Sequence, residues 1–158
     1  MDALPELLFL ALVLAYPAFQ LHLWLKRRAA FREFASARGL RFRGTLPSDK
    51  YVPYAIFERV ASAVLLYHVV EGQLNGFDIA VFDFRMRSGA RTGAIVSGLP
   101  VVDAPGPPGD GELSFDLQDG HLLGFRLAVP MEDVPAFVES VMSVAERLIP
   151  PFASPATR

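Results

Sequence analysis

Cysteine is absent from this 158-residue sequence. The chain therefore forms no disulfide bond and offers no thiolate metal ligand, a composition consistent with a reducing compartment. Its three histidines (His22, His68 and His121) show neither His-x-x-x-His nor Glu-x-x-His spacing, so a zinc site has no support. Gly-x-Ser-x-Gly and glycine-rich phosphate loops are also missing. From these absences we predict no catalytic residue, no metal site and no cofactor.

Charged residues are absent from a stretch near the N-terminus, Leu7 to Leu25 (LLFLALVLAYPAFQLHLWL). As a helix with a rise of 1.5 Å per residue, this stretch would be about 28 Å long, close to the roughly 30 Å hydrocarbon core of a bilayer. Lys26, Arg27 and Arg28 then end the apolar run. The sequence therefore predicts one transmembrane helix.

Three other interpretations of this stretch are open. A cleaved signal peptide has bases before its apolar core, whereas Asp2 and Glu6 precede this one. A buried core helix that is apolar all round suits a larger protein. An interfacial helix needs a strongly charged face, which the stretch lacks. We favour the membrane-spanning helix over all three.

The orientation of the helix follows from its flanks. Bases follow the apolar run on the C-terminal side only, at Lys26, Arg27, Arg28 and Arg32. The positive-inside rule then places Met1 outside and the domain in the cytoplasm, as in a single-pass protein of the inner membrane. Trp24 suits an interfacial aromatic belt. Pro17 predicts a kink near the middle of the helix.

The net charge of −2 conceals an asymmetry along the chain. Residues 26–91 carry a balance of +6 and residues 92–158 a balance of −6. Anionic lipids attract juxtamembrane bases by about 1 kcal/mol each, so Lys26, Arg27, Arg28 and Arg32 are candidate lipid contacts. For bases beyond Arg43 we favour simple solvation.

A second candidate anion contact is the turn that carries Arg85, Arg87 and Arg91. Three guanidinium groups at one turn could hold a lipid headgroup or a phosphate, although a solvated hairpin tip is the favoured alternative. Nucleic-acid binding is not expected, because the second half of the chain is acidic. A protein partner and the oligomeric state are left open.

Alternating apolar and polar residues predict an antiparallel sheet of six or seven strands. Asn75-Gly76 and Asp119-Gly120 are favoured hairpin turns, and residues 103–111 (DAPGPPGDG) read as a loop. The expected strands cover residues 40–43, 64–71, 77–87, 92–99, 112–117 and 121–129, and residues 48–60 fit either a strand or a helical turn. Within 77–87, Phe82, Phe84 and Met86 share one face, opposite Asp83, Arg85 and Arg87.

Two helical segments complete the predicted domain. Residues 29–38 continue the anchor helix as far as Gly39, which suits a left-handed cap. After Pro130 an amphipathic helix runs to about Ile149, with its apolar stripe at Val134, Val138, Val141, Ala145 and Leu148. The expected organisation is an anchor (1–28), a juxtamembrane helix (29–39), an α+β domain (40–150) and a loose tail (151–158).

The predicted fold class is therefore α+β, with an N-terminal transmembrane helix and a C-terminal helix that covers an antiparallel sheet or open barrel. This order is similar to pleckstrin-homology-like domains by analogy only, and the analogy carries no function.

Two classes of function fit this organisation. The first is a membrane-anchored, non-enzymatic binding or scaffolding module that contacts anionic lipid or a cytoplasmic protein. The second is a membrane-bound, hydrolase-like enzyme, which would need Asp78, Asp83 and Asp116 to converge in one cleft. His68 could meet Asp83 or Asp78, because their strands pair, but a satisfied, partly buried histidine is the favoured interpretation.

Several segments of the chain resemble a group of uncharacterised bacterial proteins that have one N-terminal transmembrane helix and a small α+β domain. The segments are Tyr54–Phe57, Val69–Gly72, Asn75–Phe77, Val81–Phe84, Leu113–Phe115, Gly120–Arg126 and the helix that ends near Leu148. The resemblance implies a membrane-tethered domain. It carries no activity and no site residues.

Overall fold

The computed structural model describes residues 3–47, 57, 65–100 and 113–149, and the side chains of its first helix from Ala11 onward except Leu12. The elements are α1 (Ala3–Ala37), β1 (Arg41–Pro47), β2 (Leu65–Leu74), β3 (Phe77–Met86), β4 (Gly89–Ser97), β5 (Ser114–Gln118), β6 (His121–Leu127), the 3₁₀ turn η2 (Met131–Asp133) and α4 (Val134–Arg147). The predicted α+β class is confirmed. Apart from Phe57, the ambiguous segment 48–60 lies outside the described residues, as do the expected loop 103–111 and tail 151–158.

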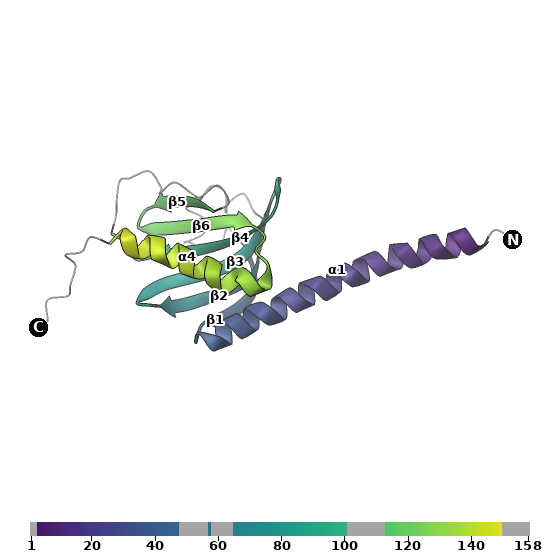
Figure 1. Ribbon diagram of the computed structural model, residues 1–158, viewed down its shortest axis with the longest axis horizontal. Coiled ribbons are helices and arrows are strands. Elements are labelled where there is room, and N and C mark those ends of the chain that lie inside the picture. Colours follow the sequence, from purple (N-terminus) through teal and green to yellow (C-terminus); the bar gives the residue numbers. More distant parts are fainter. Residues whose placement is uncertain (1–2, 48–56, 58–64, 101–112, 150–158) are drawn as a thin grey trace, which may run out of the picture.

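Helix α1 is one uninterrupted helix that passes through Pro17. Its first half projects away from the domain and its last turns pack against the sheet (Figure 1). The helix ends at the expected cap, where Gly39 has φ +65° and the Leu40 amide donates to the Ala35 carbonyl. The predicted anchor (1–28) and the predicted juxtamembrane helix (29–39) therefore belong to one continuous helix.

The two halves of α1 differ in their surroundings. Phe31, Phe34 and Ala35 are buried against the domain. The projecting half exposes large apolar side chains at Val13, Leu14, Tyr16, Phe19, Leu21 and Leu23. In the part of the chain that the structure describes, no helix is long and apolar enough to cross a membrane.

The six strands form one open antiparallel sheet in the order β1-β2-β3-β4-β6-β5. Consecutive strands are neighbours throughout, except that β6 lies between β4 and β5. Tight turns at Asn75-Gly76 and Asp119-Gly120 join two of the hairpins, with Asn75 and Asp119 at positive φ as such turns require. β1 and β5 are the edge strands, so the described strands form an open sheet and do not close into a barrel.

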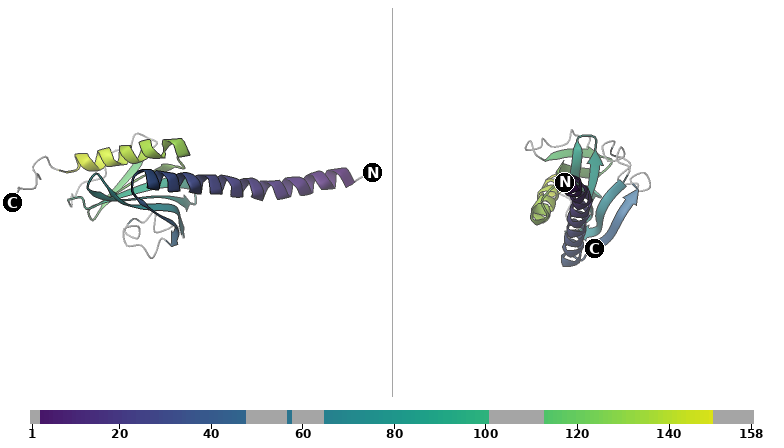
Figure 2. Two further views of the ribbon diagram at one scale, coloured as in Figure 1. Left: turned by 90° about the horizontal axis from the view of Figure 1, so that it is seen from below. Right: turned by 90° about the vertical axis from the view of Figure 1, so that its right-hand side faces the viewer.

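Both faces of the sheet are buried. On one face α1 and α4 lie side by side (Figure 2), and their apolar residues pack with Val70, Ile79 and Val81. The apolar stripe expected for the C-terminal helix forms this contact, with Val134, Val138, Val141 and Ala145 fully buried. The opposite face is a second cluster around Phe82, Phe84, Leu66 and Ile95, which Phe57 covers. The middle parts of the central strands β3 and β4 therefore have no solvated face.

Gly124 on β6 shows how closely α4 approaches the sheet. A Cβ atom at this position would lie 2.5 Å from a Val141 methyl carbon, closer than two carbon atoms can pack. Because Gly124 has no side chain, α4 can pack directly against β6.

Candidate functional site

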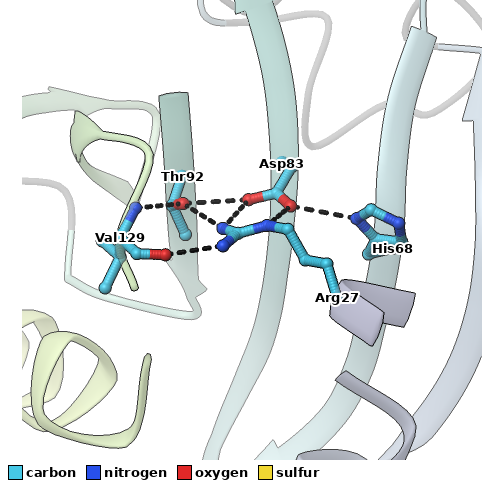
Figure 3. A network of polar contacts seen from close by, with 5 residues as sticks. All are labelled: Arg27, His68, Asp83, Thr92 and Val129. Carbon is cyan, nitrogen blue, oxygen red and sulfur yellow. Dashed lines mark hydrogen bonds and ion pairs between the residues drawn. The ribbon is translucent and has the colours of Figure 1, made fainter. Parts of the chain in front are cut away.

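The structure brings together a buried polar cluster where α1 meets the sheet (Figure 3). We call it the junction cluster, and it consists of Arg27 on α1, His68 on β2, Asp83 on β3, Thr92 on β4 and the main chain of Val129. His68, Asp83 and Thr92 are 3%, 8% and 0% exposed. Charged and polar groups this deeply buried need partners, so each contact in the cluster matters energetically.

Arg27 reaches from α1 into the sheet and binds Asp83 in a bidentate geometry. Its Nε donates to Asp83 Oδ2 at 2.5 Å and its Nη2 to Asp83 Oδ1 at 2.7 Å. The same guanidinium group donates to the Val129 carbonyl at 2.6 Å and to Thr92 Oγ1 at 2.9 Å. Such a planar fork fixes both the distance and the orientation of the two elements that it joins.

Thr92 completes the environment of the carboxylate from the neighbouring strand. It lies directly opposite Asp83 in the β3–β4 ladder and donates its hydroxyl proton to Asp83 Oδ1 at 2.9 Å. The Val129 amide donates to the same hydroxyl oxygen at 3.0 Å. The cluster thus joins α1, the three strands β2, β3 and β4, and the segment that leads into α4.

A β-bulge places His68 beside Asp83. Leu66 and Tyr67 pair with Phe84 and Asp83, but the register shifts between Tyr67 and Val70. His68 occupies the shift with φ +55°, an unfavourable conformation for a residue with a Cβ atom. Its Nδ1 lies 3.0 Å from Asp83 Oδ2. Because an ionised carboxylate only accepts hydrogen bonds, Nδ1 carries the proton that is shared with Asp83.

Aromatic rings of α1 enclose the imidazole of His68. The Phe31 ring stacks on it at a centroid distance of 5.4 Å, and the Trp24 ring lies tilted at 5.6 Å. His68 Nε2 is buried and has no hydrogen-bond partner among the residues that the structure describes. The ring is therefore held by apolar packing on one side and by one carboxylate on the other, without access to solvent.

Opposing effects act on the pKa of Asp83. Burial, the largest single contribution, raises the pKa of this carboxyl group. The hydrogen bonds from Arg27, His68 and Thr92 and the positive charge of Arg27 together outweigh burial, so the pKa lies below the ordinary value of 3.8. Asp83 is consequently ionised at neutral pH.

This lowered pKa predicts a loss of stability in acid. A carboxyl group whose pKa is lower in the folded state stabilises the fold fully above its unfolded pKa, and the contribution disappears as the pH falls through the folded pKa. We expect the free energy of unfolding of the full chain to decrease below about pH 4 more steeply than that of Asp83→Asn. Urea unfolding in detergent, followed by circular dichroism across the acid range, measures both slopes. Parallel slopes would show that Asp83 does not titrate differently in the folded state.

The sequence predicts Lys26, Arg27, Arg28 and Arg32 as lipid contacts, and the structure gives them different surroundings. Lys26 and Arg32 are exposed, whereas Arg27 is occupied by the junction cluster. Arg28 lies over the Trp24 ring at 5.2 Å, and Arg32 lies over Phe42 at the same distance. Lys26, Arg28 and Arg32 therefore lie outside the junction cluster, and each is at least partly exposed.

The three carboxylates that the enzyme hypothesis requires do not converge. Asp83 lies under α1, on the helix-covered face of the sheet. Asp78 is exposed, accepts a hydrogen bond from Gln73 at 3.2 Å and is five residues away along β3. Asp116 is on the edge strand β5, opposite Leu123 of the other face. No single cleft can use all three.

A shallow hollow of about 440 Å³ lies at the end of the sheet remote from the junction cluster. Asp78, Ser97 and His121 are direct neighbours across β3, β4 and β6 and line it together with Glu71. His121 Nδ1 is bonded to the Asp119 carbonyl at 2.8 Å, and Glu71 pairs with Arg43 at 3.4 Å. Among the described residues, no group of three acidic or histidine side chains is arranged to hold a metal ion.

The sequence predicts Asp83 or Asp78 as a possible partner of His68, and the structure shows Asp83 in that place. Nothing in the sequence indicates that Arg27 and Thr92 belong to the same cluster. No family model, no curated protein and no solved structure matches this chain.

Proposed function

We propose that this protein is a membrane-anchored, non-enzymatic binding module in which the junction cluster fixes the domain to its anchor helix. The projecting half of α1 inserts in the inner membrane as a single pass, with Met1 outside and the domain in the cytoplasm.

The observation that carries the proposal is the contrast between the two halves of one continuous helix. Val13, Leu14 and Phe19 are 49%, 63% and 58% exposed, although burying each would be favourable by about 1.5–3 kcal/mol. An exposed apolar surface of this kind indicates a lipid or protein partner. The charge-free stretch Leu7–Leu25 and the bases that follow it favour lipid.

The buried cluster supports a binding role better than a catalytic one. Every polar atom of Arg27, Asp83 and Thr92 that is described above bonds within the cluster, and α1 covers the site. A substrate would have to displace the helix to reach it. The cluster instead gives the domain a fixed orientation, which a tethered module needs in order to present its remaining surface to a partner.

Membrane fractionation of the full chain with a C-terminal tag tests the anchor. We expect the protein to stay in the membrane after carbonate extraction and the tag to be protected from protease in intact spheroplasts. Leu14→Arg with Leu21→Arg should release it, because each arginine costs about 2.5–3.5 kcal/mol at the centre of a membrane helix.

Ser36→Arg is the matched control, since Ser36 is exposed on the part of α1 beside the domain. This variant should remain in the membrane fraction. Release of the unmodified chain by carbonate would contradict insertion, and digestion of the tag would reverse the proposed orientation.

A further inference from the structure

One end of the sheet lies beside the projecting half of α1. Trp24 on α1 contacts His68, whereas Leu40, just past the end of α1, packs on Gly72. Following α1 toward its N-terminus therefore means following β2 from Gly72 back to His68. Because β3 is antiparallel to β2, the β3–β4 hairpin lies at the end of the sheet from which α1 projects (Figure 1).

We call this surface the hairpin end, and it comprises Leu65, Arg85, Arg87, Arg91 and Leu127. Arg85 and Arg87 are exposed, and Arg91 is half-buried, with its Nη2 donating to Ser88 Oγ at 3.2 Å. Leu127 lies opposite Arg91 in the β4–β6 ladder and is 66% exposed. Leu65 is 36% exposed at the start of β2.

The hairpin end combines two properties that suit the boundary of a bilayer. From residue 84 to residue 92 the hairpin carries three arginines and no acidic residue. Guanidinium groups bind phosphate oxygens in a bidentate manner, and exposed leucines beside them gain by entering the headgroup region. The exposed acids Glu132 and Asp133 belong to η2 and lie outside the hairpin.

We propose that the hairpin end rests on the anionic headgroups of the membrane that holds α1, a proposal that depends on the anchor proposed above. The rigid connection through Arg27 and Asp83 holds the hairpin on the membrane side of the domain. Tethering makes this second contact intramolecular, so weak individual attractions suffice. The contact fixes which face of the domain is turned toward the cytoplasm.

The absence of cysteine makes a direct test straightforward, because one introduced thiol is the only site of labelling. Ala90→Cys places a fluorophore on the hairpin, and Gln118→Cys places it at an exposed position at the opposite end of the sheet. The full chain is reconstituted in vesicles of phosphatidylcholine alone or with phosphatidylglycerol. Flotation measures insertion, and quenching by aqueous acrylamide measures exposure of the fluorophore.

In anionic vesicles we expect the fluorophore at position 90 to be quenched about half as strongly as the one at position 118, because headgroups shield it. Replacing Arg85, Arg87 and Arg91 together by Gln should abolish the difference. Arg41→Gln with Arg147→Gln, which removes two exposed cations elsewhere, should preserve it.

Each outcome has a separate meaning. If the chain floats with vesicles but positions 90 and 118 are quenched equally, the hairpin contact is overturned and the anchor stands. If the chain does not float, the anchor and the contact both fail. If shielding at position 90 is the same in neutral and anionic vesicles, the contact does not depend on the arginines and the proposal is again overturned.

Discussion

Arg27→Ala is expected to lower the free energy of unfolding of the full chain by about 3 kcal/mol, the lower end of the range for breaking a buried ion pair. The change leaves the Asp83 carboxylate buried without the bidentate contact to the guanidinium group, and only the hydrogen bonds from His68 and Thr92 remain. The lower end applies because the Arg27 side chain is 22% exposed and the Asp83 side chain 12% exposed, so water screens the pair in part. Urea unfolding in detergent measures the loss.

Lys26→Ala is the matched control, because Lys26 is the exposed neighbour of Arg27 on the same helix. It should change stability by less than about 0.5 kcal/mol. The combined variant Arg27→Ala with Asp83→Ala should be more stable than the sum of the two single losses predicts, because each single change leaves the other residue's charge buried without its partner. Additive losses would show that the two residues do not stabilise the fold as a pair.

Phe31→Ala is expected to cost about 3–5 kcal/mol, as for other fully buried phenylalanines. Phe31 is 0% exposed and stacks on His68, and the Arg27 guanidinium carbon lies 5.5 Å from the centre of its ring. Its removal opens a cavity beside the junction cluster and loosens α1 from the sheet. The same urea unfolding experiment measures the loss.

Phe19→Ala supplies the comparison within one helix. Phe19 is 58% exposed in the projecting half, so its removal should leave the unfolding of the domain unchanged within about 0.5 kcal/mol. Similar losses for the two variants would mean that the halves of α1 do not differ in the way that their burial indicates.

Most elements of the fold are predictable from local sequence patterns. The two hairpin turns, the alternation in β5, the cap at Gly39 and the apolar stripe of α4 each depend on residues close together in the chain. The expected helix from Pro130 to about Ile149 begins one turn later as α4, because η2 forms the first turn. These features required no knowledge of which surfaces meet.

The junction cluster could be predicted only in part, because it depends on long-range packing. Alternation in β3 places Asp83 on the same face as Arg85 and Arg87, but it does not indicate that another element covers this face at Asp83. The face is outward only at Arg85 and Arg87, and α1 covers it at Asp83. Pairing of β2 with β3 predicts either Asp83 or Asp78 as the partner of His68. Which of the two lies beside His68 depends on the β-bulge in β2, which the local sequence does not predict.

Arg27 illustrates the same limit. In the sequence it is one of three consecutive bases, and nothing distinguishes it from Lys26 or Arg28. Its role follows from its angular position on α1, which turns its side chain toward β3 once Phe31 and Phe34 are buried. A base beside an apolar segment can therefore belong to the core of the next domain.

The continuity of α1 also has a mechanical consequence. α1 runs without a linker from its exposed half to the ion pair between Arg27 and Asp83. The domain therefore has no flexible joint to its helix. A tilt or rotation of the projecting half would therefore reorient the sheet, and a force on the sheet would reorient the projecting half. We therefore expect the projecting half of α1 and the sheet to change orientation together.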